Sequence, residues 1–395
     1  MPILPPAAIG VLGGGQLGRM LALAARAMGY RIVVLDPDPD CPAASVAERV
    51  VVGSYDDVGA ALRLADRSAV VTYELEHVAA EVVAALETRL PVRPGHRPLA
   101  VTQDRLAERR FVESAGVAVA PWREVRSPEA ARAVAEELGL PLRLKVPIGG
   151  YDGRGQLRIV RLSELDDAWA RLGKPPGSAL LAERELAFDC ELSIVIARDV
   201  RGGTAAFPVA RNRHDAGILV ESVAPAPVSP WIAERATAIG ERLAAAMDLC
   251  GTLTAELFLL ADGSLLVNEL APRVHNRGHW TIEGAATSQF EQHVRAICGL
   301  SLGSPDALSP AAMVNLLGTG PRRPARLVGM NTALADPSVH VHVYDKRRVF
   351  ERRKMGHITA LSGSVDEALE RAQAALAGFS WSDDTAEPTN DEEAI

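Results

Sequence analysis

Cysteine is scarce in this chain of 395 residues, and its spacing excludes a metal-binding or redox pair. The four cysteines lie far apart and form no CxxC pattern; they are Cys41, Cys190, Cys250 and Cys298. Such scatter is typical of reduced thiols rather than of a disulfide framework. It favours a cytoplasmic location.

Long apolar runs are also missing. No stretch of about 18 uncharged apolar residues occurs, so we expect no membrane-spanning helix and no membrane partner. The first residues, MPILPPAA, lack the basic and apolar regions that are typical of a secretory signal. Both observations agree with a cytoplasmic protein.

An excess of basic residues is absent as well. The net charge is −8, but the last 14 residues hold six acidic side chains and no basic one, so the remaining chain carries only −2. Without a basic stripe, nucleic acid is not an expected partner. The polar, aromatic-free end predicts an acidic disordered tail over residues 381–395.

What is present first is an alternation of strand-like and helix-like runs from residue 8 to about 100. This pattern predicts a parallel sheet with helices on both faces, an α/β domain of Rossmann-like type. Between about 120 and 299, short apolar runs separated by turn signals predict an α+β region with antiparallel sheets. A smaller module follows residue 299, as expected for a chain of two or three domains.

A glycine loop lies between the first predicted strand and helix. It reads Gly13-x-Gly15-x-x-Gly18, and Asp36 follows near the position of a ribose-binding acid. One interpretation is a dinucleotide site of a Rossmann oxidoreductase; the other is a turn that only packs its helix. Asp36 lies in DPDPDCP, whose prolines predict a loop, and this counts against a dinucleotide.

Two carboxylates are expected to face each other in LTAELFLLADGSLLVNEL, residues 253–270. If Asp262 and Gly263 form a two-residue hairpin loop, counting outward places Glu256 directly opposite Glu269. Like charges in such a pair are destabilising unless one is protonated or a cation lies between them. The alternative is a solvated pair on an exposed face, but the apolar flanks favour a hard divalent cation.

A lysine and a second glycine loop follow each other in LPLRLKVPIGGYDGRGQLRIV. Lys145 lies within a predicted strand, and the glycines that come after it are Gly149, Gly150, Gly153 and Gly155. Backbone N–H groups of such a loop can bind a polyphosphate, with the lysine as a point charge. The alternative is an ordinary flexible hairpin, since the Walker A pattern is absent.

A basic segment, YDKRRVFERRKMGH, holds six bases and two acids between Tyr344 and His357. From the residues alone, a solvated basic loop is favoured over a phosphate-binding site.

Taken together, these motifs resemble one family. The segments GVLGGGQLGRML, TYELEHV, GGYDGRGQ, TAELFL, VNELAPRVHNRGHW, SQFEQHVRAI and VYDKRRVFERRKMGHIT are similar to those of ATP-grasp carboxylases, specifically the N5-carboxyaminoimidazole ribonucleotide synthases of purine biosynthesis. The resemblance covers about residues 8–375. It implies an ATP-grasp fold with an N-terminal parallel α/β domain (1–104), a central ATP-grasp region (105–299, lid about 120–184) and a small C-terminal domain (300–380).

The implied activity is ATP-dependent carboxylation of 5-aminoimidazole ribonucleotide with bicarbonate, through carboxyphosphate, with release of ADP and phosphate. ATP is a co-substrate, Mg²⁺ is implied, and homodimers are usual. Three rivals stay open: formate-dependent formylation of glycinamide ribonucleotide by a related ATP-grasp enzyme, the Rossmann oxidoreductase, and a non-catalytic nucleotide-binding scaffold.

The resemblance also implies roles for individual residues. ATP-binding positions are Arg105, Lys145, Gly150, Tyr151, Asp152, Gly153, Arg154, Gly155, Gln156, Glu183, Arg184, Glu185, Leu186, Glu191, His214, Asn268 and Glu269, with residues 183–186 as the hinge segment at adenine. Metal-binding positions are Glu256 and Glu269. Bicarbonate and the amine meet at Tyr151, Asp152, Arg154, Arg273, His275 and Asn276. The ribonucleotide is bound by Gln16, Glu74, Lys346 and Arg353.

Some positions depart from the family pattern. Pro147 and Ile148 stand where basic or threonine residues are common, and Arg277 stands where serine is common. The first departure concerns the flexibility of the lid, and the second implies an extra cation near the site. The group that takes the amine proton is left open between His275 and Asp152.

Overall fold

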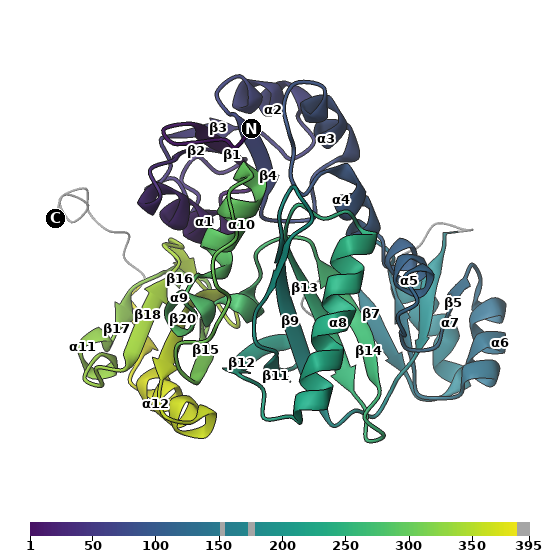
Figure 1. The fold of residues 1–395 in the computed structure, drawn as a ribbon. Helices are drawn as coiled ribbons and strands as arrows, with labels where there is room; N and C mark the ends of the chain where they lie inside the picture. Colours follow the sequence, from purple (N-terminus) through teal and green to yellow (C-terminus); the bar gives the residue numbers. More distant parts are fainter. Residues whose placement is uncertain (151–154, 173–177, 385–395) are drawn as a thin grey trace.

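The computed structural model describes residues 1–150, 155–172 and 178–384 (Figure 1). Its N-terminal part is a four-stranded sheet in the order β3-β2-β1-β4, and every pairing in it is parallel. The strands are β1 (Ala8–Leu12), β2 (Arg31–Asp36), β3 (Arg49–Val52) and β4 (Val70–Tyr73). The predicted parallel α/β domain is confirmed.

Helices cover both faces of this sheet. They are α1 (Gln16–Ala27), α2 (Val58–Ala65), α3 (Ala80–Glu87) and α4 (His96–Gln103). One face packs α1 together with a later helix, α10 (Gln289–Cys298), and the other packs α2 and α3. Helix α4 was not predicted, because its Pro98 suggested a break. A proline in the first turn of a helix is tolerated, since the N–H it lacks has no partner there.

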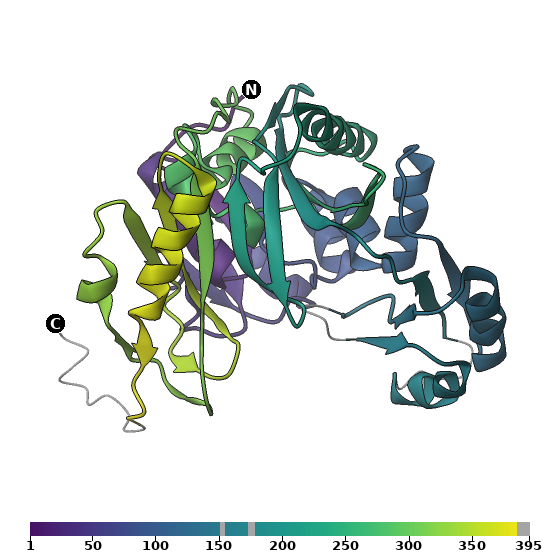
Figure 2. The same cartoon turned by 90° about the horizontal axis from the view of Figure 1, so that it is seen from below.

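The lid is a separate four-stranded antiparallel sheet in the order β5-β8-β6-β7. Its elements, with the helix that leads into it, are α5 (Arg105–Ser114), β5 (Trp122–Val125), α6 (Pro128–Leu138), β6 (Leu142–Lys145), β7 (Gln156–Ile159), η1 (Leu162–Glu164), α7 (Leu165–Arg171) and β8 (Leu180–Arg184). Figure 2 shows the lid at the opposite end of the molecule from the C-terminal helix.

The central sheet has nine strands, all in antiparallel pairs, in the order β14-β13-β9-β11-β12-β15-β20-β18, with β10 beside β9. Its strands are β9 (Cys190–Arg198), β10 (Thr204–Ala206), β11 (Ala210–Asp215), β12 (Ile218–Ala224), β13 (Gly251–Leu259), β14 (Leu265–Ala271), β15 (Ala311–Leu317), β18 (Val339–Val343) and β20 (Lys354–Leu361). Pairing of β12 with β15 carries the sheet across the predicted boundary at residue 299. The domain limits themselves stay predictions.

The remaining elements flank this sheet. They are α8 (Pro230–Ala246), η2 (Asn276–Gly278), α9 (Thr281–Gly284), β16 (Arg323–Pro324), β17 (Leu327–Val328), α11 (Met330–Ala333), β19 (Arg348–Val349), α12 (Val365–Ala377) and β21 (Ser380–Trp381). Helix α8 packs against β9 and β13, and α12 packs against β15 and β20. No helix within the described ranges has the length and apolar character needed to cross a membrane.

The predicted disordered tail begins too early. Trp381 is buried among Leu316, Val349 and Met355, and β21 pairs with β17. The Ser382 carbonyl accepts a hydrogen bond of 2.7 Å from Arg323. The acidic composition of the segment hid this one aromatic anchor. Residues 385–395, the rest of the predicted tail, lie outside the described residues.

Candidate active site

The two predicted carboxylates do face each other. Glu256 on β13 and Glu269 on β14 are direct cross-strand partners, as the sequence predicted. The predicted two-residue loop is wrong, however. The Leu260 amide bonds the Ser264 carbonyl, so the loop has three residues, and the pairing register shifts between Glu256 and Leu257. The longer loop displaces the register by one residue, and the bulge restores it at the glutamates.

Each glutamate is paired with an arginine. A nitrogen of Arg277 lies 2.8 Å from an oxygen of Glu256, and Arg105 lies 3.4 Å from Glu269. Burial raises the pKa of Glu256 to about 7; Arg277 opposes this shift, and Glu269 adds to it. This carboxylate therefore needs positive charge beside it to stay ionised near neutral pH.

The donor set fits Mg²⁺. This ion usually takes one or two protein carboxylates and completes its shell with substrate phosphates and water. Glu256 and Glu269 supply the carboxylates, and the Asn268 amide donates to Glu256 over 3.1 Å. In the part of the chain that the structure describes, no group of three His, Cys, Asp or Glu side chains could hold a metal. Phosphate oxygens from a nucleotide would have to complete the site.

A buried chain of charges supports the predicted ATP-binding lysine. The Lys145 ammonium donates to Glu183, Arg109 donates to the other oxygen of Glu183 over 2.8 Å, and Arg109 also donates to Glu108 over 3.0 Å. Glu108 in turn accepts from the Leu270 amide over 2.7 Å. The chain thus links the lid to the strand that carries Glu269. Glu108 and Arg109 were missed, because a helical "ER" pair has no distinctive sequence signal.

Removing the central carboxylate of this chain should destabilise the protein. Glu183→Gln leaves the buried Lys145 without a compensating charge and the buried Arg109 with Glu108 alone. We therefore expect the free energy of unfolding at pH 7 to fall by about 3–5 kcal/mol. Urea unfolding followed by circular dichroism measures it. Glu185→Gln is the matched control, since the half-buried Glu185 pairs with the more exposed Arg143 and Arg158, and such pairs contribute about 0–1 kcal/mol.

The same substitution has a pH signature. Burial alone would raise the pKa of Glu183, but Lys145 and Arg109 outweigh burial and lower it to about 2. A lowered carboxyl pKa stabilises the fold above its unfolded value and loses that effect as pH falls towards 2. The stability gap between wild type and Glu183→Gln should therefore narrow from about pH 4.5 downwards. An unchanged gap at pH 3 would contradict this role.

Arg105 joins the lid hairpin to Glu269, one of the two predicted metal ligands. It is the first residue of α5, its guanidinium donates to the Gly150 carbonyl over 3.1 Å, and its amide donates to the Pro147 carbonyl. Gly149 and Gly155 have positive φ angles of 83° and 70°, which a side chain would strain. Gln156 pairs with Lys145. The predicted residues Tyr151, Asp152, Gly153 and Arg154 lie outside the described residues.

The predicted hinge segment directly follows the lid sheet. Glu183 and Arg184 end β8, and the Glu185 amide donates to the Pro141 carbonyl. Glu185 points to Arg143 and Arg158, and Leu186 is partly buried. A role of Arg184, Glu185 and Leu186 at adenine stays a prediction.

Glu191 and His214 meet at the metal side of the central sheet. The Nδ1 atom of His214 contacts the Glu191 carboxylate, and its other ring nitrogen lies 2.8 Å from Arg277. His214 lies in β11, where the pairing register shifts. The polar run RNRHD lacks the apolar residues by which a strand is recognised. Burial lowers the pKa of His214, although Glu191 opposes the shift.

The three predicted residues after β14 lie together. Arg273 is held by Glu76 through a hydrogen bond of 2.9 Å and an ion-pair contact of 2.8 Å, and the sequence did not reveal this partner. Burial, with Arg273 and Arg277 adding to it, holds the pKa of His275 well below its usual range, so its ring is neutral near pH 7. Both polar atoms of the buried Asn276 amide lack a hydrogen-bond partner within the described ranges. Buried amides are rarely left so, which fits a polar ligand here.

The predicted ribonucleotide-binding residues come from opposite ends of the chain. The Lys346 ammonium donates to the Gln16 side chain over 2.8 Å, at the start of α1. Arg353 lies on the same loop as Lys346, between β18 and β20, and donates to the Arg348 carbonyl. The fold therefore brings the basic segment to the N-terminal domain, as a binding site for one substrate would require.

The first glycine loop is closed by protein carboxylates. Glu74 accepts from the amides of Gly15 and Gly18, and Asp36, at the end of β2, accepts from Gly14 over 2.8 Å. The N-terminus of α1 is thus already occupied by a carboxylate, where a dinucleotide fingerprint would bind pyrophosphate. Asp36 ends a strand rather than lying in a loop. Glu74 is buried, and a direct contact with substrate stays a prediction.

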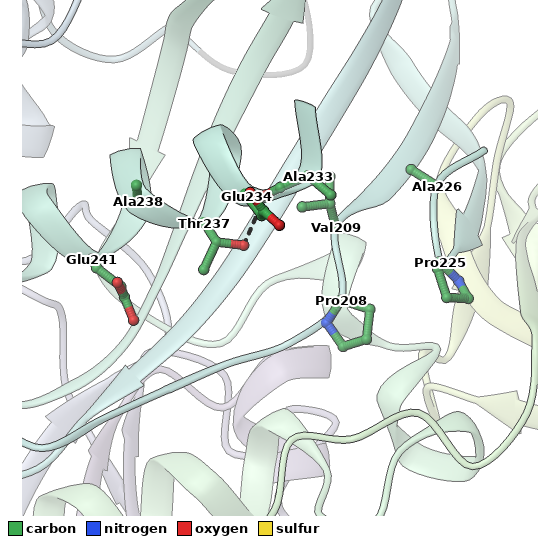
Figure 3. A pocket seen from close by; sticks show the side chains of 9 residues that line it. All are labelled: Pro208, Val209, Pro225, Ala226, Ala233, Glu234, Thr237, Ala238 and Glu241. Atoms are coloured by element: carbon green, nitrogen blue, oxygen red, sulfur yellow. Dashed lines mark hydrogen bonds between the residues drawn. The ribbon is translucent and has the colours of Figure 1, made fainter. Parts of the chain in front are cut away.

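Two cavities differ in chemistry. One of about 580 Å³ lies between the N-terminal domain and the lid and is lined by, among others, Glu76, Arg105, Gly150, Glu269 and Arg273. The second, of about 360 Å³, lies beside α8 and is lined by small, proline and acidic residues (Figure 3). Its lining holds no basic side chain, so a phosphate ligand belongs in the first cavity.

Models of three protein families match consecutive parts of the chain. The ribonucleotide synthetase preATP-grasp domain matches residues 7–103, the ATP-grasp domain matches 110–290, and the phosphoribosylaminoimidazole carboxylase C-terminal domain matches 311–371.

Named relatives match over nearly the whole length. An N5-carboxyaminoimidazole ribonucleotide synthase of Brucella melitensis is 43% identical over 360 residues, 90% of this chain and 97% of its own. One of Bacillus subtilis is 40% identical over 368 residues, 93% and 95% of the two chains. A crystal structure of the Aspergillus clavatus N5-carboxyaminoimidazole synthase with ADP and 5-aminoimidazole ribonucleotide superposes with a TM-score of 0.85 at 31% identity, covering 94% of this chain and 98% of the other.

Proposed function

The chain belongs to the N5-carboxyaminoimidazole ribonucleotide synthase family of ATP-grasp ligases, and we propose that the residues described above carry out its reaction. The enzyme uses ATP to carboxylate 5-aminoimidazole ribonucleotide to the N5-carboxy product. The observation that carries the residue assignment is the opposed pair Glu256 and Glu269 beside the cavity under the lid. Formylation of glycinamide ribonucleotide is not favoured, because the relatives that match most of the chain are named N5-carboxyaminoimidazole ribonucleotide synthases.

In this proposal, phosphoryl transfer is accelerated by electrostatic stabilisation of the phosphates. Glu256 and Glu269 would hold Mg²⁺, which neutralises charge on the ATP phosphates. Lys145, held by Glu183, places a positive charge beside the phosphates, and the β6–β7 hairpin would offer them backbone N–H groups at Gly149, Gly150 and Gly155. Arg105, which bonds both Gly150 and Glu269, couples the position of this hairpin to the metal-binding carboxylate. A bicarbonate oxygen then attacks the γ-phosphorus, the bond to the β,γ-bridging oxygen breaks, and carboxyphosphate and ADP form.

The second half of the reaction takes place at the loop after β14. Arg273, fixed by Glu76, stabilises carboxylate charge, and the unpaired Asn276 amide offers a donor and an acceptor to bicarbonate. Carboxyphosphate yields carbon dioxide and phosphate where water is excluded, and the amine of the ribonucleotide attacks the carbon dioxide. Two groups are candidates for taking the amine proton: His275, whose ring is neutral, and Asp152.

Three finer features belong to the same proposal. Lys346 and Arg353 bind the ribonucleotide phosphate, and Gln16 and Glu74 face the same substrate. The enzyme works in the cytoplasm, in agreement with its reduced, scattered cysteines, which are all free in the structure. It forms a homodimer, as is usual in the family.

The decisive test is ADP release measured by a coupled assay. We expect full release only with ATP, bicarbonate and 5-aminoimidazole ribonucleotide together, and a fall to background when carbon-dioxide-free buffer replaces bicarbonate. Formate in place of bicarbonate, with glycinamide ribonucleotide as the acceptor, should give no ADP. Release under these last conditions would identify the formylating relative instead.

A further inference from the structure

One buried cation occupies the carboxylate that would bind the metal. The Arg277 side chain, on the turn η2 after β14, is only 6% exposed, and its Nη2 atom lies 2.8 Å from Oε2 of Glu256. The same nitrogen lies 2.8 Å from the His214 ring. The Asn268 amide donates to the same Oε2 atom of Glu256 over 3.1 Å. One oxygen of Glu256 therefore already has an ion-pair partner and a hydrogen-bond donor.

The charges around this contact keep Arg277 in place. Glu269 lies directly across the hairpin from Glu256, and Glu191 holds the far side of His214. Arg277 is thus set among three carboxylates in a water-poor site, where a guanidinium loses its hydration and gains paired charge instead.

We propose that Arg277 is a resident counter-cation of Glu256, which a divalent ion must displace, so that the ion binds tightly only together with nucleotide. This inference rests on the proposed metal role of Glu256 and Glu269. A guanidinium and a divalent ion on one carboxylate repel each other strongly where water is scarce. If Arg277 holds Glu256 in about nine of ten molecules, the apparent Kd for the ion is about tenfold weaker than that of the open site.

Bound nucleotide shifts the competition between Arg277 and the divalent ion for Glu256 in favour of the ion. The triphosphate of ATP brings negative charge that a displaced guanidinium can bind by two parallel hydrogen bonds. It also completes the coordination of the metal ion. Metal and nucleotide therefore strengthen each other's binding, and by thermodynamic linkage the factor is the same in both directions.

The experiment measures Mn²⁺, a paramagnetic ion suited to carboxylate sites, binding to the full-length, nucleotide-free protein by electron paramagnetic resonance. Arg277→Ser and Arg277→Gln should each bind Mn²⁺ about tenfold more tightly than wild type. Arg277→Lys keeps the charge and should stay within about threefold of wild type. Arg213→Ser removes an exposed arginine that pairs with Glu221 on the same sheet and should change nothing. Saturating ADP should tighten Mn²⁺ binding more in wild type than in the two neutral variants.

The outcomes separate this inference from the proposed function. Loss of Mn²⁺ binding in Glu256→Gln, together with unchanged binding in both neutral Arg277 variants, would retain the metal site and overturn the role of Arg277. Unchanged Mn²⁺ binding in Glu256→Gln would overturn the metal site itself, and this inference with it. If Arg277→Lys and Arg277→Gln both bind Mn²⁺ more tightly than wild type, the shape of the Arg277 side chain and not its charge weakens Mn²⁺ binding. This result would also contradict the inference. If Arg277→Ser does not fold, the Gln and Lys variants carry the comparison.

Discussion

Glu256→Gln and Glu269→Gln should each lower kcat/KM by about a hundredfold or more, a loss near 2.7 kcal/mol of transition-state stabilisation. Each substitution removes one of the two carboxylates that face each other across the β13–β14 hairpin and that we propose to hold the metal. Glutamine keeps the size and one acceptor oxygen but not the charge that a hard divalent ion needs. Steady-state ADP release at saturating bicarbonate measures the effect.

The two variants differ in what else they disturb. Glu256 is buried, and its loss leaves Arg277 without its carboxylate, so a lower melting temperature is expected as well. Glu269 is half exposed and pairs with Arg105 only over 3.4 Å, so its loss should affect turnover far more than stability. Asp262→Asn, at the exposed tip of the same hairpin, is the matched control and should retain activity. A loss below about tenfold for Glu269→Gln in a folded protein would contradict the metal role.

Lys346→Ala and Arg353→Ala should raise the KM for the ribonucleotide by about ten- to a hundredfold. A charge-assisted bond to phosphate contributes about 1.5–3 kcal/mol. The KM for ATP should barely change, because the Lys145 network lies between the lid and α5, whereas Lys346 contacts α1 through Gln16. Higher salt should weaken ribonucleotide binding in wild type and less so in the variants.

The neighbouring Arg347 provides the control for this prediction. It lies on the same basic segment, but its side chain is 65% exposed and pairs with Asp40 over 2.9 Å. Arg347→Ala should leave both KM values nearly unchanged, although it removes the same charge. If the Lys346 and Arg353 variants instead lose affinity for ATP and keep their affinity for the ribonucleotide, the prediction is contradicted, because this segment would then bind ATP.

Short-range patterns could be predicted well from the sequence. Alternating apolar runs predicted the parallel N-terminal sheet, and the hairpin between residues 253 and 270 predicted the facing pair Glu256 and Glu269. The predicted pairing of the two glutamates is correct although the predicted loop length is wrong, because the bulge beside Glu256 shifts the register back by one residue. Polar strands such as β11 and the proline-containing helix α4 escaped prediction, since tertiary packing outweighs the local preference of their residues.

Local sequence patterns were enough to predict three units of this protein: a glycine turn, a lysine-bearing strand followed by a glycine-rich hairpin, and a hairpin with opposed carboxylates. These units depend on hydrogen bonds between residues close in the chain. What each unit contacts, in contrast, could be seen only in the packed molecule. Glu74 closes the glycine turn, Arg109 shares Glu183 with Lys145, and Arg277 occupies Glu256. These partners come from different elements, and their meeting depends on how whole sheets and helices pack, which no local pattern encodes.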